Sequence, residues 1–263
     1  VGFTNALFML GASFLLGGLK HRVQEFNRTG ARFQAGLLFL ATVALLIPSA
    51  VNAADTAAAG MFTEKLSLAL AVLLIAIYGL GLLFSLKTHN ELFASAEEHG
   101  GDGETPWPIG LALGTLAGIT VLVALVSEVF VASVQEAAET MRMSRAFVGF
   151  IVVALVGAAA EMAAAFSAAR KDRLDLSVGI ALGSSTQIAL FVAPVLVLAS
   201  YVLGPAPMTL QFWPGAVLMM LIATITASFV ANGGRSAWFV GVLVIAVYLT
   251  FAITLYLLPP RAQ

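Results

Sequence analysis

The sequence predicts an all-α integral membrane protein with about eight transmembrane helices. Of its 263 residues, 60% are hydrophobic and only 10% are charged, whereas about 25% charged residues is usual in soluble domains. The mean hydropathy is +0.99. Apolar runs long enough to cross about 30 Å of hydrocarbon recur along the chain. The lipid bilayer is therefore the expected surrounding, and it is the inner (plasma) membrane if the source is prokaryotic.

Eight segments qualify as spans, and short polar segments separate them. The expected spans are residues 1–19, 34–50, 66–86, 108–130, 146–169, 176–203, 212–230 and 236–258. Nine Lys and Arg residues fall in alternate loops on one side, and four fall in the loops on the other side. The positive-inside rule therefore predicts that the loop from Lys20 to Arg32 is cytoplasmic.

One polar stretch, residues 87–107, divides the chain into two halves. Residues 1–86 hold three expected spans, and residues 108–258 hold five. The stretch between them is an expected acidic cytoplasmic linker, and its acids include Glu97, Glu98, Asp102 and Glu104. Such a segment is typical of a solvated hinge. The alternative is a cation-sensing strip.

The composition excludes several classes of function. A net charge of −1 leaves no basic face for phosphates, so we expect no nucleic-acid partner. The chain has no cysteine, and His21, His89 and His99 all fall in expected loops. No Ser/His/Asp set, zinc motif or phosphate loop is present at a membrane face. We therefore expect neither an enzyme nor a cofactor.

Two carboxylates, Glu128 and Glu161, fall inside expected spans. An ionised carboxylate near the bilayer centre costs at least about 2.5 kcal/mol, so it marks a functional site by default. Glu128 lies within about a turn of its expected helix end, where a neighbour can satisfy it, which makes it at most an accessory acid. Glu161 lies deeper and is the stronger candidate.

The depth of Glu161 follows from the charged turn Arg170–Asp175, which joins two antiparallel helices. Glu161 and Ser184 each lie about eleven residues, or roughly 17 Å, from the centre of that turn. Both therefore reach the midplane, where a polar run begins on the second helix. That run is Ser184, Ser185, Thr186 and Gln187.

These residue types favour a hard cation. Carboxylate, hydroxyl and amide oxygens suit Ca²⁺, Mn²⁺ or Na⁺, with Glu161 as the charged metal ligand. Burial disfavours the charged form of a carboxylate, so a proton competes with the cation for the same group. Gly157 and Gly183 are expected to let the helices approach closely beside the site.

Two motifs carry a resemblance to a known family. The stretch from Gly149 to Met162 ends Val-Gly-Ala-Ala-Ala-Glu-Met, and the stretch from Asp175 to Pro194 contains Gly-Ser-Ser-Thr-Gln. Together, at about residues 149–194, they resemble the second α-repeat of the calcium/proton antiporters, the CAX branch of the cation/Ca²⁺ exchanger superfamily. Phe14-Leu-Leu-Gly-Gly-Leu-Lys20 and Lys87-Thr-His-Asn-Glu-Leu-Phe93 add to the resemblance.

The resemblance implies a fold of ten core helices in two inverted halves, each with a glutamate-bearing α-repeat. The eight spans resemble core helices three to ten, so we expect the sequence to be incomplete at its N-terminus and to lack the first-repeat glutamate. Thr4-Asn5 then stands opposite Thr186-Gln187 as an internal echo. The implied cation and proton site consists of Glu161 with Asn5, Ser184, Ser185 and Gln187, flanked by Gly157 and Gly183.

The resemblance implies a secondary antiporter that exchanges Ca²⁺ for H⁺, with Glu161 binding metal and proton alternately. A second chain or the missing helices would complete the site. Two alternatives remain open. Ala158 and Met162 replace the family's usual Asn and His, which favours a noncatalytic or degenerate exchanger-like subunit. A single carboxylate balances a monovalent ion, which favours Na⁺ or K⁺ exchange against H⁺.

Overall fold

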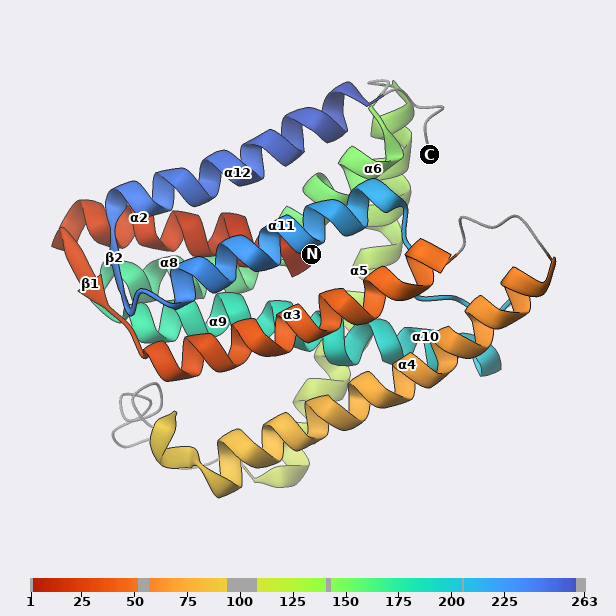
Figure 1. Ribbon diagram of the computed structural model, residues 1–263, viewed down its shortest axis with the longest axis horizontal. Helices are drawn as coiled ribbons and strands as arrows, with labels where there is room; N and C mark the ends of the chain where they lie inside the picture. Colours follow the sequence, from red (N-terminus) through yellow and green to blue (C-terminus); the bar gives the residue numbers. More distant parts are fainter. Residues whose placement is uncertain (1, 52–56, 94–107, 141–142, 205, 259–263) are drawn as a thin grey trace.

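The computed structural model describes residues 2–51, 57–93, 108–140, 143–204 and 206–258. Helices make up most of this part of the chain (Figure 1). The elements of the first half are α1 (Gly2–Thr4), η1 (Asn5–Met9), α2 (Leu10–His21), β1 (Val23–Glu25), α3 (Arg28–Val51), α4 (Ala57–Leu83), η2 (Phe84–Thr88) and η3 (Asn90–Leu92). Those of the second half are α5 (Ile109–Thr140), α6 (Arg145–Phe147), η5 (Val148–Val153), α7 (Ala154–Gly157), α8 (Ala159–Arg170), α9 (Leu174–Gln187), η6 (Ile188–Val192), α10 (Ala193–Leu203), α11 (Pro214–Ala231), β2 (Arg235–Ala237) and α12 (Trp238–Leu257).

The number of membrane spans agrees with the sequence. Seven helices in the described residues are long and apolar enough to cross a bilayer, and a bent pair, Val148–Gly157 with Ala159–Arg170, makes an eighth. The prediction of an all-α membrane protein with about eight spans is therefore confirmed. One boundary is wrong: α5 continues to Thr140, so Glu128 lies about three turns inside its helix and not near the end.

The helices pack mainly across the two predicted halves. In Figure 1, α2 lies along α12, and α3 lies along α11. The hairpin of α8 and α9 packs against α2 and also, through α9, against α3, while α10 packs on α4. All of these pairs except α8 with α9 join residues 1–86 to residues 108–258. The division into two halves and a linker stays a prediction, and the linker acids Glu97, Glu98, Asp102 and Glu104 lie outside the described residues.

Helices α2 and α12 approach closely, with Gly11 and Gly241 facing one another. A Cβ placed on Gly241 would lie 2.5 Å from the Gly11 carbonyl oxygen and would also meet the Leu15 backbone nitrogen. Small residues at such contacts let helices in a bilayer gain packing energy that larger side chains would prevent. At Gly157 and Gly183, by contrast, a Cβ would meet nothing within 4 Å in the described residues. The described residues thus make no close approach at these two glycines, and the close approach stays a prediction.

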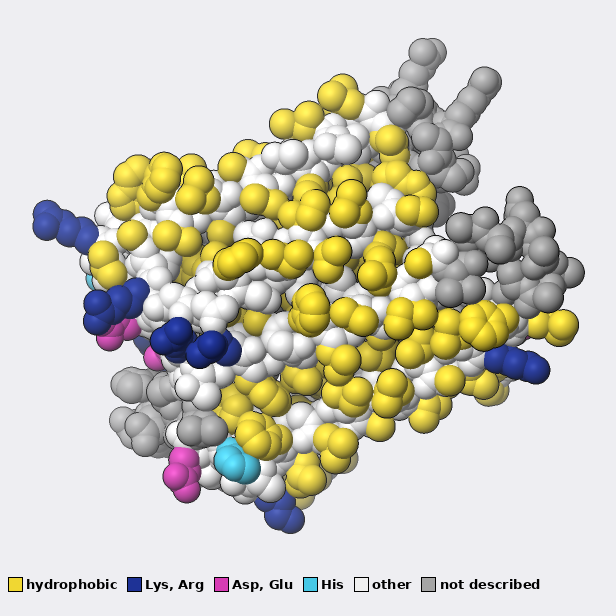
Figure 2. All heavy atoms as spheres, in the orientation of Figure 1, with side chains coloured by type: hydrophobic (Ala, Val, Ile, Leu, Met, Phe, Trp, Pro, Cys, Tyr) yellow, Lys and Arg dark blue, Asp and Glu magenta, His cyan; other side chains and the backbone are white. Residues whose placement is uncertain are grey.

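Basic side chains gather at one end of the bundle, where α2, β1 and β2 meet (Figure 2). We call it the basic end, and it includes Lys20, Arg22, Arg28, Arg170 and Arg235. There β1 and β2 pair antiparallel and place Glu25 opposite Arg235, whose side chains form an ion pair at 2.8 Å. Hydrophobic side chains cover the helices between the two ends. Which side of the membrane the basic end faces stays a prediction.

A larger side chain at the α2–α12 contact tests how tightly the two helices pack. Gly241→Ala places a methyl group against the backbone of α2, so we expect overpacking to lower the free energy of unfolding by about 1–3 kcal/mol. Gly79→Ala on α4 is the matched control, because a Cβ there meets nothing within 4 Å among the described residues. Thermal unfolding in detergent measures both, and equal stability of the two variants would contradict the packing.

Candidate functional site

Glu161 lies just after a sharp break in its span. The helix that includes η5 and α7 and the helix α8 meet at an angle of 62°. Ala158 lies between them with φ −99° and ψ 7°, outside the helical region. Glu161 falls in the first turn of α8, where the helix dipole favours a negative charge. Broken spans near the midplane are where secondary transporters hold their substrates.

Three polar side chains from three different elements converge at this break. The Ser184 hydroxyl donates to Glu161 Oε2 at 2.6 Å, and Asn5 Nδ2 donates to the same oxygen at 3.2 Å. Asn5 Nδ2 also lies 3.0 Å from the Ser184 Oγ, which can accept from it. Glu161 and Ser184 therefore do lie side by side, as their equal distances from the Arg170–Asp175 turn predict. We call Glu161, Ser184 and Asn5 the carboxylate triad.

The triad leaves oxygen atoms free for a ligand. Asn5 Oδ1 is buried and has no hydrogen-bond partner among the described residues. No hydrogen bond within the described part of the chain ends on Glu161 Oε1 either. Because Glu161 carries the one charge of the triad, these oxygens form a weakly anionic site. The described residues contain no group of three or more His, Asp or Glu that could hold a metal.

The other members of the polar run point away from the carboxylate. Ser185 donates to the carbonyls of Gly2 and Ala181, at 2.9 and 2.7 Å. Thr186 donates to the Gln34 carbonyl at 3.2 Å, and Gln187 is exposed. Consecutive side chains on an α-helix diverge by about 100°, so a run of four cannot all face one point. The structure thus brings Ser184 to Glu161 but not Ser185 or Gln187.

Glu161 lies on a face of α8 that the described residues leave exposed. Gly157, Ala160, Glu161 and Ala164 follow the i, i+3, i+4, i+7 spacing of one helix face, and all four are exposed. Glu128 is likewise exposed on α5 and makes no hydrogen bond to the triad among the described residues. The described part of the chain therefore gives the site one carboxylate and not two.

The two residues that depart from the family's usual motif, Ala158 and Met162, face the apolar core and not the exposed side of α8. Ala158 and Met162 are 1% and 6% exposed and belong to the main apolar cluster, with Ala165 and Leu182. Neither lies on the exposed face of α8 that carries Glu161. These substitutions therefore alter the apolar packing behind the carboxylate, while the hydrogen bonds of the triad remain intact.

The two matching amide positions of the internal repeat, Asn5 and Gln187, both adjoin a π-helical segment, which the sequence did not indicate. Asn5 begins the π-helical segment η1, and Gln187 directly precedes the π-helical segment η6. Single π turns in α-helices occur frequently at functional sites. The two echo positions therefore share a local backbone form, although Asn5 is buried in the triad and Gln187 is exposed.

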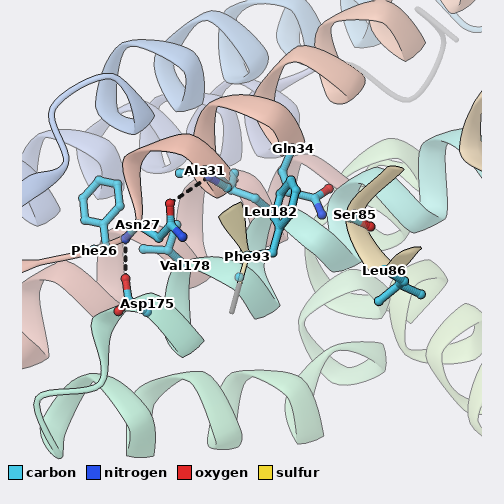
Figure 3. A pocket seen from close by; sticks show the side chains of 12 residues that line it. Phe26, Asn27, Ala31, Gln34, Ser85, Leu86, Phe93, Asp175, Val178 and Leu182 are labelled. Carbon is cyan, nitrogen blue, oxygen red and sulfur yellow. Dashed lines mark hydrogen bonds between the residues drawn. The ribbon is translucent and has the colours of Figure 1, made fainter. Parts of the chain in front are cut away.

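A separate pocket of about 190 Å³ lies between α3, α9 and the segment after α4 (Figure 3). Asp175 lines it and accepts a hydrogen bond from the backbone N–H of Asn27, whose own side chain caps the start of α3 at Gly30. Leu182 and Val178 line the same pocket from α9. Glu161 and Ser184 do not line it, so this pocket is distinct from the triad.

Comparison with known proteins places this chain in a family. The model of the sodium/calcium exchanger protein family matches residues 2–87 and 111–257. The chain therefore belongs to this family of membrane cation transporters.

Individual relatives are similar over nearly the whole chain. The Ca²⁺/H⁺ antiporter of Aphanothece halophytica is 36% identical over 269 residues, which cover 97% of this chain and 72% of that protein. The Ca²⁺/H⁺ antiporter ChaA of Bacillus subtilis is 38% identical over 260 residues, with the same shares. Among solved structures, native YfkE matches with a TM-score of 0.79 and 35% identity, over 98% of this chain and 72% of its own.

Proposed function

We propose that the protein exchanges Ca²⁺ for H⁺ across the membrane and that Glu161 binds the two ions in turn. The observation that carries this proposal is the carboxylate triad at a broken span. A carboxylate that accepts two hydrogen bonds beside a free amide oxygen can hold a hard cation, and the same oxygen can take a proton instead. The similarity to named Ca²⁺/H⁺ antiporters supports the choice of ions.

The carboxylate triad can adopt two arrangements, one without a cation and one with a cation bound. In the cation-free state, Ser184 and Asn5 donate to Glu161. Cation binding turns the hydroxyl so that its lone pairs face the ion, and rotation of the Asn5 amide presents Oδ1 in place of Nδ2. Protonation of Glu161 removes its charge and releases the cation. Because one group serves both ions, occupancy by one excludes the other.

Charge balance adds a requirement. One carboxylate leaves a bound Ca²⁺ with a net charge of +1, which is costly away from water. We propose that a second carboxylate, from outside the described residues or from another chain, meets the exposed face of α8 at Glu161. The second candidate function is exchange of Na⁺ or K⁺ against H⁺. The single carboxylate of the described residues favours it, because one negative charge neutralises a monovalent cation.

Replacement of the carboxylate tests the assignment. Reconstituted protein should take up ⁴⁵Ca²⁺ when a pH gradient is imposed, and Glu161→Gln should abolish the uptake because the amide neither holds a charge nor exchanges a proton. Glu128→Gln is the matched control, since Glu128 is an exposed carboxylate on α5 that makes no hydrogen bond to the triad among the described residues.

The outcomes separate the candidates. Uptake that survives Glu161→Gln would refute the role of Glu161. Uptake of ²²Na⁺ or ⁸⁶Rb⁺ with none of ⁴⁵Ca²⁺ would favour monovalent exchange, with ⁸⁶Rb⁺ as the tracer for K⁺. No gradient-driven transport of any of these cations would favour the noncatalytic subunit.

Two neighbouring serines test the geometry of the triad. Ser184→Ala removes the 2.6 Å hydrogen bond to Glu161 and one neutral ligand. In the proposed cation-bound state the Ser184 oxygen faces the ion, and a polar contact with a charged group contributes about 1.5–3 kcal/mol, so loss of this ligand should raise the half-saturating Ca²⁺ concentration about ten-fold. Ser185→Ala removes bonds to backbone carbonyls only and should change this concentration little. A larger rise in Ser185→Ala than in Ser184→Ala would contradict the triad.

A further inference from the structure

Four buried polar atoms on α9 and on the segment from η1 to β1 lack a hydrogen-bond partner among the described residues. They are Asn5 Oδ1, Ser13 Oγ, Ser177 Oγ and Gln24 Oε1, and a fifth such atom, the Tyr248 hydroxyl, lies on α12. Ser13 and Ser177 are both 0% exposed. An unpaired buried hydroxyl costs about 1–3 kcal/mol, so each of these groups needs a partner in the working protein.

The two serines differ from several other helical hydroxyls among the described residues. Ser185, Thr42 and Ser228 each donate back to the carbonyl four residues earlier, as hydroxyls in transmembrane helices usually do. Ser13 and Ser177 make no such bond in the described residues. Their hydroxyls are therefore available to a partner other than their own helix.

Ser177 lies on the same face of α9 as Ser184. It precedes Ser184 by seven residues, which is close to two helical turns and roughly 10 Å along the axis. Ser184 faces Glu161 and Asn5, so Ser177 faces the same interface, closer to the basic end.

Ser13 occupies the matching position on α2. It lies eight residues beyond Asn5, or roughly 12 Å closer to the basic end. Ser13 shares a helix face with Gly17, four residues later, and Gly17 lies against the Gln24 side chain and the last turn of α8. The Gly17 face of α2 meets α8, so Ser13 lies on the side of α2 toward the hairpin, and the rise per residue puts it at about the depth of Ser177.

At the basic end the same interface reaches a titratable group. Gln24 is 3% exposed, and its Nε2 donates to the Asp172 carboxylate at 2.8 Å. Asp172 is exposed in the turn between α8 and α9. The Arg170 carbonyl in that turn lies 2.9 Å from Lys20 Nζ and 3.1 Å from His21 Nε2. The interface thus has polar groups at three depths between Glu161 and solvent.

We propose that Ser13 and Ser177 relay protons between Glu161 and Asp172 through hydrogen-bonded water, along a path that the cation does not use. A hydroxyl donates and accepts at once, as a relay requires. A buried water needs two to four polar partners, and the unpartnered atoms supply them. Two hydroxyls and one amide are too few for Ca²⁺, which takes six to eight oxygen ligands. This inference rests on the proposed function.

The relay conserves charge and protons. When Glu161 gives up its proton, the carboxyl O–H bond breaks and a new O–H bond forms on the adjacent relay oxygen. Each relay oxygen then passes a proton onward, and the last one reaches Asp172 or bulk water. One proton leaves the carboxyl and one arrives at the basic end, while the carboxylate becomes free for the cation.

Two transport assays on the reconstituted protein separate proton movement from cation movement. Uptake of ⁴⁵Ca²⁺ driven by a pH gradient requires both, whereas exchange of ⁴⁵Ca²⁺ for unlabelled Ca²⁺ at equal pH requires only the cation site and its alternating access. The test variant is the double substitution Ser13→Ala and Ser177→Ala. Each change replaces a hydroxyl that makes no hydrogen bond to the described residues, so the fold should be retained, and thermal unfolding checks this. Ser228→Ala, whose hydroxyl is bonded within α11, is the control.

We expect the double variant to slow gradient-driven uptake about ten-fold or more, as loss of a positioned proton carrier does, while Ca²⁺/Ca²⁺ exchange stays at the control's rate. A parallel loss in both assays would overturn the relay and assign the serines to the cation path or to packing. Unchanged gradient-driven uptake would also overturn it. Absence of both activities in the unsubstituted protein would instead overturn the proposed function.

Discussion

A single carboxylate held by hydrogen bonds from two other helical elements is the constraint on which this structure depends. Glu161 is fixed by Ser184 from α9 and by Asn5 from η1, so the broken span, its hairpin partner and the first span meet at one point. The basic end provides the second attachment, where Lys20, His21 and Gln24 all hydrogen-bond to the turn between α8 and α9. Between these two attachments the first span and the hairpin are held along their length, and the polar groups between them are confined to one interface.

The chemistry follows from the small number of charges. In the proposed mechanism one carboxylate does not hold a proton and a cation at once, so competition for Glu161 couples the two fluxes in opposite directions. Glu161 Oε2 accepts hydrogen bonds from Ser184 and Asn5, and the Asn5 Oδ1 beside it has no partner among the described residues. The substitutions at Ala158 and Met162 lie in the apolar cluster and leave these hydrogen bonds in place, which weakens the argument for a degenerate subunit.

Much of this architecture could be predicted from the sequence, because a bilayer imposes simple rules. Hydropathy located the spans, and the charged turn after Arg170 set Glu161 and Ser184 at equal depth, a relation that depends only on the rise per residue. The rotation of each helix could not be predicted in this way, so Ser185 and Gln187 were wrongly assigned to face Glu161. The break at Ala158 was also missed, since alanine has no conformational signature. The pairing of β1 with β2 joins segments far apart in sequence, and no local pattern indicates it.

The central claim is that proton and cation compete for Glu161, and proton release on cation binding tests it most directly. Purified protein in weakly buffered detergent solution is titrated with Ca²⁺ at a series of starting pH values, while the pH is recorded. The account predicts that Ca²⁺ binding releases protons and that Glu161→Gln removes this release, whereas Glu128→Gln retains it. Ca²⁺ binding with the same proton release in Glu161→Gln as in the unsubstituted protein would contradict the account.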